Sequence, residues 1–134
     1  MEPTLAFPEA EKLGRGPETV AWTAAAALTV ANLREAYRRG IFPWPGRPRD
    51  PIPWCCPRRR AVLKFSELTP GRTLEKTARK PGWSYSIDRA FPEVIAACAA
   101  APRPGQAGTW ISPAVVNAYT ALHRAGWAHS VEVW

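Results

Sequence analysis

Proline most constrains what this chain can fold into. The 134-residue sequence contains 15 prolines, and six of them fall within residues 43–57. Proline has no backbone N–H and a fixed φ, so this stretch predicts a loop. The same stretch carries Trp44 and Trp54 among arginines. Tryptophans are not expected in a solvated linker, because they must be buried or bind a partner. We therefore predict that residues 38–65 are ordered.

Length and composition indicate one cytoplasmic domain. The chain is long enough for a single hydrophobic core, and 46% hydrophobic with 22% charged residues is ordinary for a globular protein. No run approaches the roughly 18 apolar residues of a membrane helix, and the first residues are acidic where a secretory signal is basic. Three cysteines make a poor disulfide framework, so we expect reduced thiols.

The positive charge is concentrated in residues 34–80. The whole chain carries +7, whereas this segment has thirteen Lys or Arg against four Asp or Glu, a local balance of +9. A basic stretch with interleaved aromatic residues suits a polyanion that offers flat rings, such as single-stranded or terminal nucleotides. A solvated basic face with its aromatic residues in the core is the alternative, and residue types leave both open.

Hydrophobic periodicity predicts short helices and strands in mixed order, which indicates an α+β domain. The expected helices are 29–40, 73–80, the segment after Asp88, and 113–125; the expected strands are 61–65, 83–87 and 128–134. Four residues are expected to cap the helices at their N-termini, namely Thr29, Thr73, Asp88 and Ser112. Residues 1–18 are expected to form a loose arm, and the state of 19–28 is left open.

Few residues point to local chemistry. Cys98 lies on the apolar stripe of its helix, which favours a packed core thiol over a nucleophile. His129 alternates with Val131, which favours a hydrogen-bonded structural histidine over a general base. The adjacent Cys55 and Cys56 lack the ligand spacing of zinc sites, so we predict no metal site. No phosphate-binding loop or dinucleotide motif is present, and these residues indicate no reaction.

Two loop tryptophans are better clues to function. Trp44 lies between two prolines near arginines, and Trp110 lies between a glycine-containing loop and a capped helix. Such rings are either hydrophobic plugs or stacking platforms, and a base stacked on an aromatic ring gains about 1–3 kcal/mol. The residues themselves leave both interpretations open.

Five sequence blocks together resemble the leucyl/phenylalanyl-tRNA–protein transferases. They are AYRRGIFPWP (36–45), DPIPWCCPRRRAVL (50–63), DRAFPEVIAACAA (88–100), GTWISPAVVNAY (108–119) and LHRAGWAHSVEVW (122–134). The resemblance implies transfer of leucine or phenylalanine from aminoacyl-tRNA to the α-amine of an N-terminal Lys or Arg, which marks bacterial proteins for degradation. It implies no metal or redox cofactor.

The resemblance also implies site residues. It gives Trp44 and Trp110 contact with the 3′-terminal adenosine and places Tyr119 near the substrate; it implies no catalytic residue. It offers the tRNA acceptor phosphates as partners for the basic residues Arg38, Arg39, Arg58, Arg59 and Arg60.

The chain departs from the family pattern in three places. Ala25–Ala27 replaces a Gly-Gly-Asp turn, and Cys55-Cys56 replaces Trp-Ser. Family members continue for roughly another hundred residues, about one domain, through an acetyltransferase-like lobe that holds the aminoacyl side chain. We therefore expect a shortened form, with an N-terminal arm and Ala-rich segment (1–28), an N-terminal lobe (29–109) and the start of the second lobe (110–134).

Three hypotheses about function follow from the shortened form. The chain is an aminoacyltransferase, a non-catalytic module that binds RNA ends or a protein partner, or a fragment without function. The alternation over 128–134 is still running at the last residue, so this strand exposes an edge that permits self-association.

Overall fold

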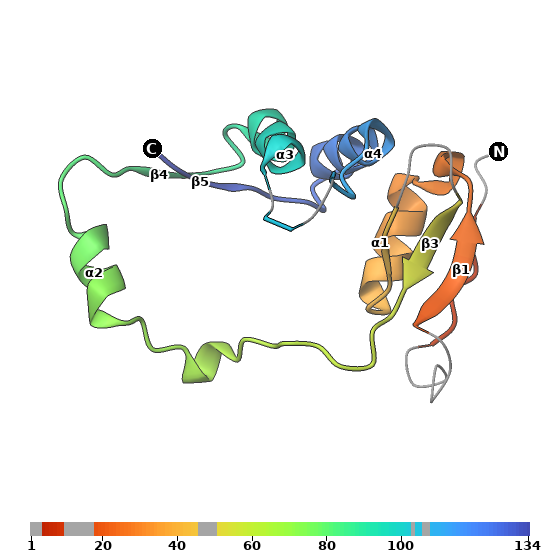
Figure 1. Cartoon of the computed structure of the whole chain (residues 1–134), viewed down its shortest axis with the longest axis horizontal. Coiled ribbons are helices and arrows are strands. Elements are labelled where there is room, and N and C mark those ends of the chain that lie inside the picture. Colours follow the sequence, from red (N-terminus) through yellow and green to blue (C-terminus); the bar gives the residue numbers. More distant parts are fainter. Residues whose placement is uncertain (1–3, 10–17, 46–50, 103, 106–107) are drawn as a thin grey trace.

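The computed structural model describes residues 4–9, 18–45, 51–102, 104–105 and 108–134. Within them four helices and five strands form a mixed α+β domain, as the sequence predicts (Figure 1). The strands are β1 (Thr19–Thr23), β2 (Phe42–Pro43), β3 (Ile52–Cys55), β4 (Tyr85–Ile87) and β5 (Val131–Val133). The helices are α1 (Val30–Arg38), α2 (Arg72–Ala78), α3 (Phe91–Ala100) and α4 (Pro113–Arg124). No helix in these ranges is both long and apolar enough to span a membrane.

The first sheet is antiparallel, with β3 between β1 and β2. Residues 19–28, whose state the sequence leaves open, form β1 and a 3-10 helix over Ala25–Ala27. The prediction of a loop over the proline-rich stretch is wrong where β2 and β3 form. Proline's fixed φ is compatible with extended backbone, and these strands are only two and four residues long, so few ladder hydrogen bonds are lost.

Helix α1 forms as its sequence predicts. Thr29 is the N-cap, and its Oγ1 accepts a hydrogen bond from the backbone N–H of Asn32 at 3.2 Å. Leu33 and Ala36 are fully buried on the inner stripe. Gly40 follows the helix with φ +70°, a left-handed conformation that ends the helix and turns the chain into β2.

The core lies between the first sheet, α1 and α4. Trp54 of β3 is fully buried at its centre, and Phe7 packs against it with ring centroids 4.9 Å apart. The backbone N–H of Leu5 also donates to Asn32 Oδ1 at 2.9 Å. The expectation of a loose arm is therefore wrong for residues 4–9, because Phe7 covers an indole that would otherwise meet water; residues 10–17 lie outside the described part.

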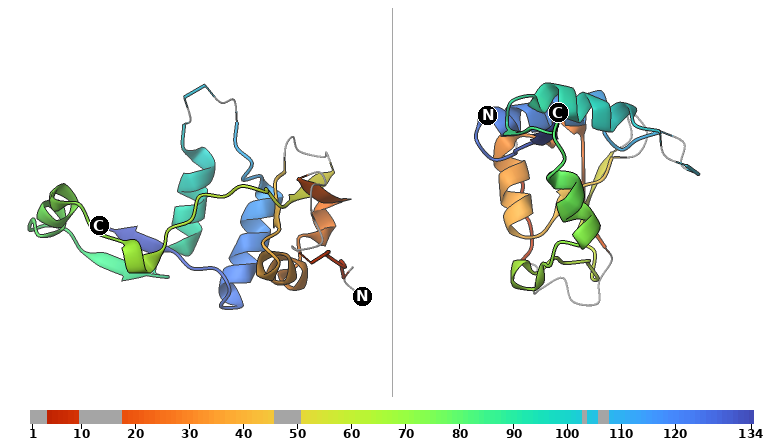
Figure 2. Two further views of the ribbon diagram at one scale, coloured as in Figure 1. Left: turned by 90° about the horizontal axis from the view of Figure 1, so that it is seen from below. Right: turned by 90° about the vertical axis from the view of Figure 1, so that its left-hand side faces the viewer.

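Residues 61–84 form an excursion away from the core (Figures 1 and 2). The predicted strand over 61–65 does not form, and all five residues are exposed. An apolar run becomes a strand only where another strand can pair with it, and no strand lies beside this one among the described residues. Helix α2 does form, but it begins at Arg72 with Gly71 as N-cap in place of Thr73.

A second, two-stranded antiparallel sheet joins β4 to β5, as the alternating patterns predict. The sequence also predicts that the apolar side chains of β4 are half-buried, and that prediction is wrong. Tyr85 and Ile87 are exposed, whereas Glu132 on the opposite face is buried. The ribbon therefore turns its polar face inward.

Of the two N-cap residues predicted for α3 and α4, only Ser112 caps its helix. Asp88 has φ +59° and does not cap α3, whose N-cap is Ala90 without a side-chain bond. Ser112 caps α4 as predicted, accepting from the Val115 N–H at 3.4 Å. Cys98 is exposed, so the prediction of a core thiol is wrong. An apolar stripe therefore does not guarantee burial.

Candidate functional site

The two loop tryptophans meet in space. Trp44 follows β2, where its backbone N–H donates to the Pro53 carbonyl at 2.8 Å, and Trp110 precedes the Ser112 N-cap of α4. Their ring centroids are 5.8 Å apart with planes only 14° from parallel. Trp44 is 49% exposed, in contrast to the buried Trp54. Trp110 is partly buried against the core, so Trp44 supplies the accessible face of the pair.

Further aromatic rings extend this pair into a row. Phe42 meets Trp44 edge-on at 5.8 Å, and Tyr119 of α4 meets Trp110 edge-on at 6.3 Å. Tyr37 of α1 meets Tyr119 at 6.3 Å with the planes perpendicular. Edge-to-face contacts fix ring orientation as well as adding burial. The structure thus brings together all three predicted aromatic site residues, Trp44, Trp110 and Tyr119.

The hydroxyl groups of Tyr37 and Tyr119 form a hydrogen bond with each other. Burial raises the pKa of both phenols; the bond to Tyr119 partly offsets the rise for Tyr37, and the neighbouring Tyr37 adds to the rise for Tyr119. Both phenols are therefore neutral near pH 7. One hydroxyl donates to the other, and the second keeps its proton for an external acceptor. The pair can donate a hydrogen bond to a ligand but is not a base.

A cavity of about 510 Å³ opens beside the two tyrosines, between α1 and α4. Its polar wall includes Arg34, Arg38 and His129, and its apolar wall includes Trp127. The guanidinium carbon of Arg34 lies 4.0 Å from the Trp127 ring centroid, a cation–π contact that holds both side chains at the rim. This cavity combines positive charge with aromatic surface.

The sequence reasoning missed Arg34, Tyr37 and Trp127. Arg34, Tyr37 and Arg38 are spaced i, i+3, i+4, so helical spacing alone places them on one face of α1. Tyr37 was assigned to the apolar stripe with Leu33 and Ala36, yet it is half-exposed at the cavity. The sequence around Trp127, which follows α4, contains no pattern that indicates a site residue.

The remaining predicted arginines do not share this arrangement. Arg39 forms ion pairs with Glu35 at 2.6 Å and Glu9 at 2.5 Å, and donates to the Phe7 carbonyl at 2.8 Å. The hydrogen bond to Glu35 is the main cause that raises the Arg39 pKa. Arg39 thus ties α1 to the N-terminal arm, and a phosphate would have to compete with two carboxylates for it.

Arg58, Arg59 and Arg60 are exposed after β3. The Arg60 guanidinium donates to the Gly40 carbonyl and lies 5.7 Å from the Phe42 ring centroid. Arg60 therefore lies against the aromatic row.

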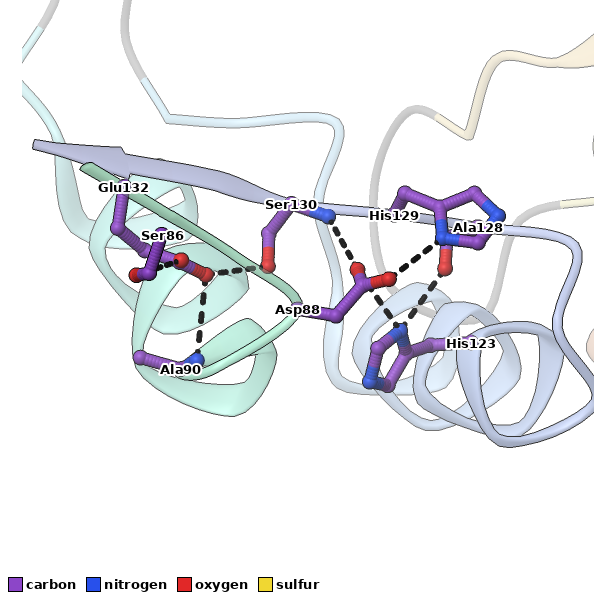
Figure 3. A network of polar contacts seen from close by, with 8 residues as sticks. All are labelled: Ser86, Asp88, Ala90, His123, Ala128, His129, Ser130 and Glu132. Atoms are coloured by element: carbon purple, nitrogen blue, oxygen red, sulfur yellow. Dashed lines mark hydrogen bonds and ion pairs between the residues drawn. The ribbon is translucent and has the colours of Figure 1, made fainter.

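A polar network joins the segment just before β5 to Asp88 and α4, and it borders the cavity through His129 (Figure 3). His129 Nδ1 donates to Asp88 Oδ2 at 2.6 Å, and the Ser130 N–H donates to Asp88 Oδ1 at 2.9 Å. The bond from His129 is the main cause that lowers the Asp88 pKa. His123 Nδ1 lies 2.8 Å from the Ala128 carbonyl, which can only accept, so this nitrogen carries a proton. His129 is thus hydrogen-bonded, as the sequence predicts.

Glu132 anchors the second sheet to α3 (Figure 3). Glu132 is 6% exposed, and its carboxylate accepts from Ser130 Oγ at 2.6 Å, Ser86 Oγ at 2.5 Å and the Ala90 N–H at 3.2 Å. These bonds, that from Ser130 first, lower the Glu132 pKa. Because Ala90 is the N-cap of α3, the carboxylate also faces the positive end of the helix dipole.

Residues able to hold a metal ion do not gather in the described part of the chain: no three His, Cys, Asp or Glu side chains there form such a group. The described cysteines are free. The groups described at this site are aromatic rings, arginine guanidinium groups and two neutral tyrosine hydroxyls.

The fold and the site define a small α+β domain with a row of exposed and partly buried aromatic residues beside a basic cavity. Comparison with protein families gives two matches: the model for leucyl/phenylalanyl-tRNA protein transferase covers residues 62–134, and the model for the N-terminal domain of that protein covers residues 26–58. The chain belongs to the leucyl/phenylalanyl-tRNA protein transferase family.

Curated relatives named leucyl/phenylalanyl-tRNA–protein transferase agree with the family models. The one from Aeromonas hydrophila is 51% identical over 80% of this chain and 45% of its own length. The one from Ralstonia pickettii is 43% identical over all of this chain and 56% of its own length, and that from Laribacter hongkongensis is 44% identical over 96% and 54%. The chain spans about half the length of the curated relatives it matches.

Proposed function

We propose that the chain binds the 3′-terminal adenosine of leucyl- or phenylalanyl-tRNA at the Trp44–Trp110 pair. The observation that carries this proposal is the near-parallel stacking of the half-exposed Trp44 indole on the partly buried Trp110 indole, next to a basic cavity. A nucleobase gains about 1–3 kcal/mol from each aromatic face on which it stacks, and every type of base can stack in this way. The family membership supports an aminoacyl-tRNA as the nucleic acid.

The spacing of the pair limits how adenine binds. A ring held between two others needs them roughly 7 Å apart, because each carbon–carbon contact is about 3.5 Å. The centroids of Trp44 and Trp110 are 5.8 Å apart. Adenine therefore stacks on the open face of Trp44, or the two indoles move apart to admit it. The free proton of the Tyr37–Tyr119 pair then serves as a donor to an acceptor atom of the terminal nucleoside.

Arginines around the aromatic row would meet the phosphates. Arg38 lines the cavity and Arg60 lies against Phe42, and the exposed Arg58 and Arg59 add positive charge. Such contacts position a nucleic acid without reading its sequence, and they weaken as salt rises. Arg39 stays a predicted phosphate contact, with its two ion pairs as competitors.

The reaction we propose for the chain is transfer of Leu or Phe to the α-amine of an acceptor protein with an N-terminal Lys or Arg. In this step the amine attacks the ester carbonyl, a C–N bond forms, the ribose oxygen leaves, and the proton lost by the amine passes to the leaving oxygen. Alignment of amine and ester supplies much of the rate. In this chain the aromatic row contributes alignment of the adenosine; no catalytic residue is assigned. This function places the protein in the cytoplasm.

Binding of an aminoacylated tRNA tests the nucleoside site. We expect Trp44→Ala to weaken the binding of phenylalanyl-tRNA about 5- to 150-fold, equivalent to one stacking contact. Trp22→Ala is the control, because Trp22 is also an exposed indole but lies on β1, outside the aromatic row. Equal affinity of the Trp44→Ala variant and the parent chain would show that Trp44 is no stacking platform.

A transfer assay tests the reaction. Radiolabelled leucyl- or phenylalanyl-tRNA is incubated with the chain and a protein bearing an N-terminal arginine, and label in the protein is measured. We expect transfer that falls with Trp44→Ala. Intact tRNA binding without transfer would leave binding as the function of this chain.

A non-catalytic module is the second candidate function. Among the described residues β5 pairs with β4 alone, so its outer edge is open to a strand from a second copy or another protein. A concentration-independent monomer in analytical ultracentrifugation would exclude self-association through this edge.

The division of the chain into an N-terminal segment and two lobes, with boundaries at residues 28 and 109, stays a prediction.

A further inference from the structure

Two arginines of α1 reach the cavity beside the tyrosine pair with no counter-charge. Arg34 and Arg38 lie one helical turn apart on the same face of α1, and both line the cavity. Both are exposed, and within the described residues neither guanidinium forms an ion pair or a hydrogen bond. The adjacent Arg39, by contrast, is paired with two carboxylates. Arg34 and Arg38 therefore leave two positive charges available to an anion.

The surroundings of the cavity do not neutralise these charges. None of the described residues that line it is acidic. Asp88 contacts the lining residue His129, but its carboxylate already accepts hydrogen bonds from His129 and the Ser130 N–H. A cavity lined by one sign of charge concentrates ligands of the other sign. The acceptor protein proposed above is cationic at its N-terminus, so these arginines repel it and attract an anionic ligand.

Trp127 adds a flat surface at the rim of the cavity. It is 52% exposed, and its backbone N–H donates to the Leu122 carbonyl at 3.0 Å. The guanidinium carbon of Arg34 lies 4.0 Å from its ring centroid. Nucleobases stack on aromatic rings and also on guanidinium planes. The cavity thus offers, side by side, a partner for a phosphate and a stacking surface for a base.

The cavity also adjoins the proposed adenosine site. Tyr119 meets Trp110 edge-on at 6.3 Å and lines the cavity with its other neighbour, Tyr37. The cavity volume of about 510 Å³ lies within the range of about 300–1,000 Å³ that is usual for small-molecule sites. One continuous surface therefore runs from the stacked tryptophans to the two arginines.

We propose that this cavity binds a second nucleotide of the single-stranded tRNA 3′ end, on the 5′ side of the terminal adenosine. Its phosphate pairs with Arg34 and Arg38, and its base stacks against Trp127. The inference rests on the proposed function, because the adenosine at Trp44 brings the strand to the cavity. Such contacts position a strand without reading its sequence. A strand held at two points cannot rotate about its terminal adenosine, so this site helps to align the aminoacyl ester.

Probes of two lengths separate the two sites. The chain is titrated with adenosine that carries a 3′-amide-linked phenylalanine, and with the oligonucleotide ACCA that carries the same 3′ group. We expect the parent chain to bind the oligonucleotide more tightly. Trp127→Ala should weaken oligonucleotide binding about 5-fold or more and leave binding of the adenosine probe unchanged. Trp134→Ala is the matched control, because Trp134 is also a half-exposed indole with an arginine near its ring, but lies outside the cavity lining.

Replacing the cation tests the phosphate contact independently of the indole. Arg34→Gln should reduce the slope of log affinity against log salt concentration by about 0.7 for the oligonucleotide, as expected for one phosphate contact to a single strand. Arg89→Gln is the control, because Arg89 lies 5.9 Å from the Trp134 ring centroid and removes the same charge outside the cavity lining. Arg34 is exposed, so thermal melting of Arg34→Gln should match that of the parent chain.

Two results would overturn the proposal. Oligonucleotide binding by Trp127→Ala and Arg34→Gln that equals that of the parent chain would show that the cavity holds no nucleotide. Equal weakening of both probes by Trp127→Ala would show that the cavity belongs to the adenosine site itself. Failure of the adenosine site is a separate result, namely unchanged binding of the adenosine probe in Trp44→Ala, because Trp44 does not line the cavity.

Discussion

The two sheets of this molecule share an alternating sequence pattern, but one buries its apolar face and the other exposes it. In β3, Ile52 and Trp54 alternate with Pro53 and Cys55, and the apolar pair is buried in the core. In β4 and β5 the apolar residues alternate in the same manner but lie on the exposed face, while the residues between them face inward. Alternation thus predicts a strand correctly in both sheets and predicts the buried face correctly in only one.

The difference lies in what each sheet packs against. The inner face of β3 meets the apolar stripe of α1 and the ring of Phe7, so apolar side chains fit there. The inner face of the ribbon meets the start of α3, where unpaired backbone N–H groups require acceptors, and the Glu132 carboxylate supplies them. The neighbouring element, and not the strand, decides which face is covered.

The largest expected effect concerns the centre of the first sheet. Trp54→Ala removes a fully buried indole, its contact with Phe7 and its 2.9 Å hydrogen bond to Thr23, so we expect a loss of about 3–5 kcal/mol in the free energy of unfolding. Urea denaturation measures it. Trp22→Ala on β1, whose side chain is 66% exposed, should change stability by about 0.5 kcal/mol or less. Similar losses for both would mean that the indole of Trp54 is not the centre of the core.

The next largest effect concerns the inner face of the ribbon. Glu132→Ala leaves two serine hydroxyls and the Ala90 N–H buried without their acceptor, so we expect clear destabilisation, smaller than that of Trp54→Ala. Glu132→Gln keeps one carbonyl acceptor and should be milder. Amide exchange at Ala90 reports the loss locally. An unchanged exchange rate in Glu132→Ala would show that the carboxylate does not hold the ribbon to α3.

Acid should weaken the ribbon through its two carboxylates. The pKa values of Asp88 and Glu132 are lower in the folded protein than in the unfolded chain, so the folded state binds fewer protons. Their stabilisation is complete above the unfolded values near pH 4 and is lost as pH falls through the folded values. Thermal melting between pH 2 and 7 measures this loss.

Asp88→Asn should flatten that acid dependence. Asparagine tolerates the positive φ at this position, so the variant removes the titrating group with little added strain. Glu93→Gln, in the exposed first turn of α3, controls for the loss of one negative charge. An acid slope in Asp88→Asn as steep as in the parent chain would show that Asp88 does not contribute to it.

Elements with local determinants were predictable from the sequence. The α1 and α4 helices each have a capping side chain and an apolar stripe, and both formed where predicted. The strand predicted over 61–65 failed because strand formation depends on a distant partner. Asp88 failed as a cap because Ser130 and His129, more than forty residues away, bind its carboxylate instead. Such contacts have no signature in the local sequence.

The candidate site was predictable only in part. Family resemblance singled out Trp44, Trp110 and Tyr119, and the fold brings these three rings together. Tyr37 was missed because an aromatic residue on an apolar stripe is usually buried, and its hydroxyl partner lies 82 residues away. Arg39 was predicted as a site residue, but the fold pairs it with Glu9, and no local sequence pattern predicted that ion pair. Residue type and spacing predict candidates, while the fold determines which of them meet.

The smallest expected effect concerns the exposed face of the ribbon and sharpens the contrast between the sheets. Ile87→Ala removes an apolar side chain that is 70% exposed, so we expect a change of about 0.5 kcal/mol or less in the free energy of unfolding of the isolated chain. The same substitution at Ile52, buried in β3, should cost about 2–5 kcal/mol. Urea denaturation of both variants gives the comparison directly. A cost at Ile87 that approaches the cost at Ile52 would mean that the ribbon face is already covered in solution, and that the two sheets bury their apolar faces alike.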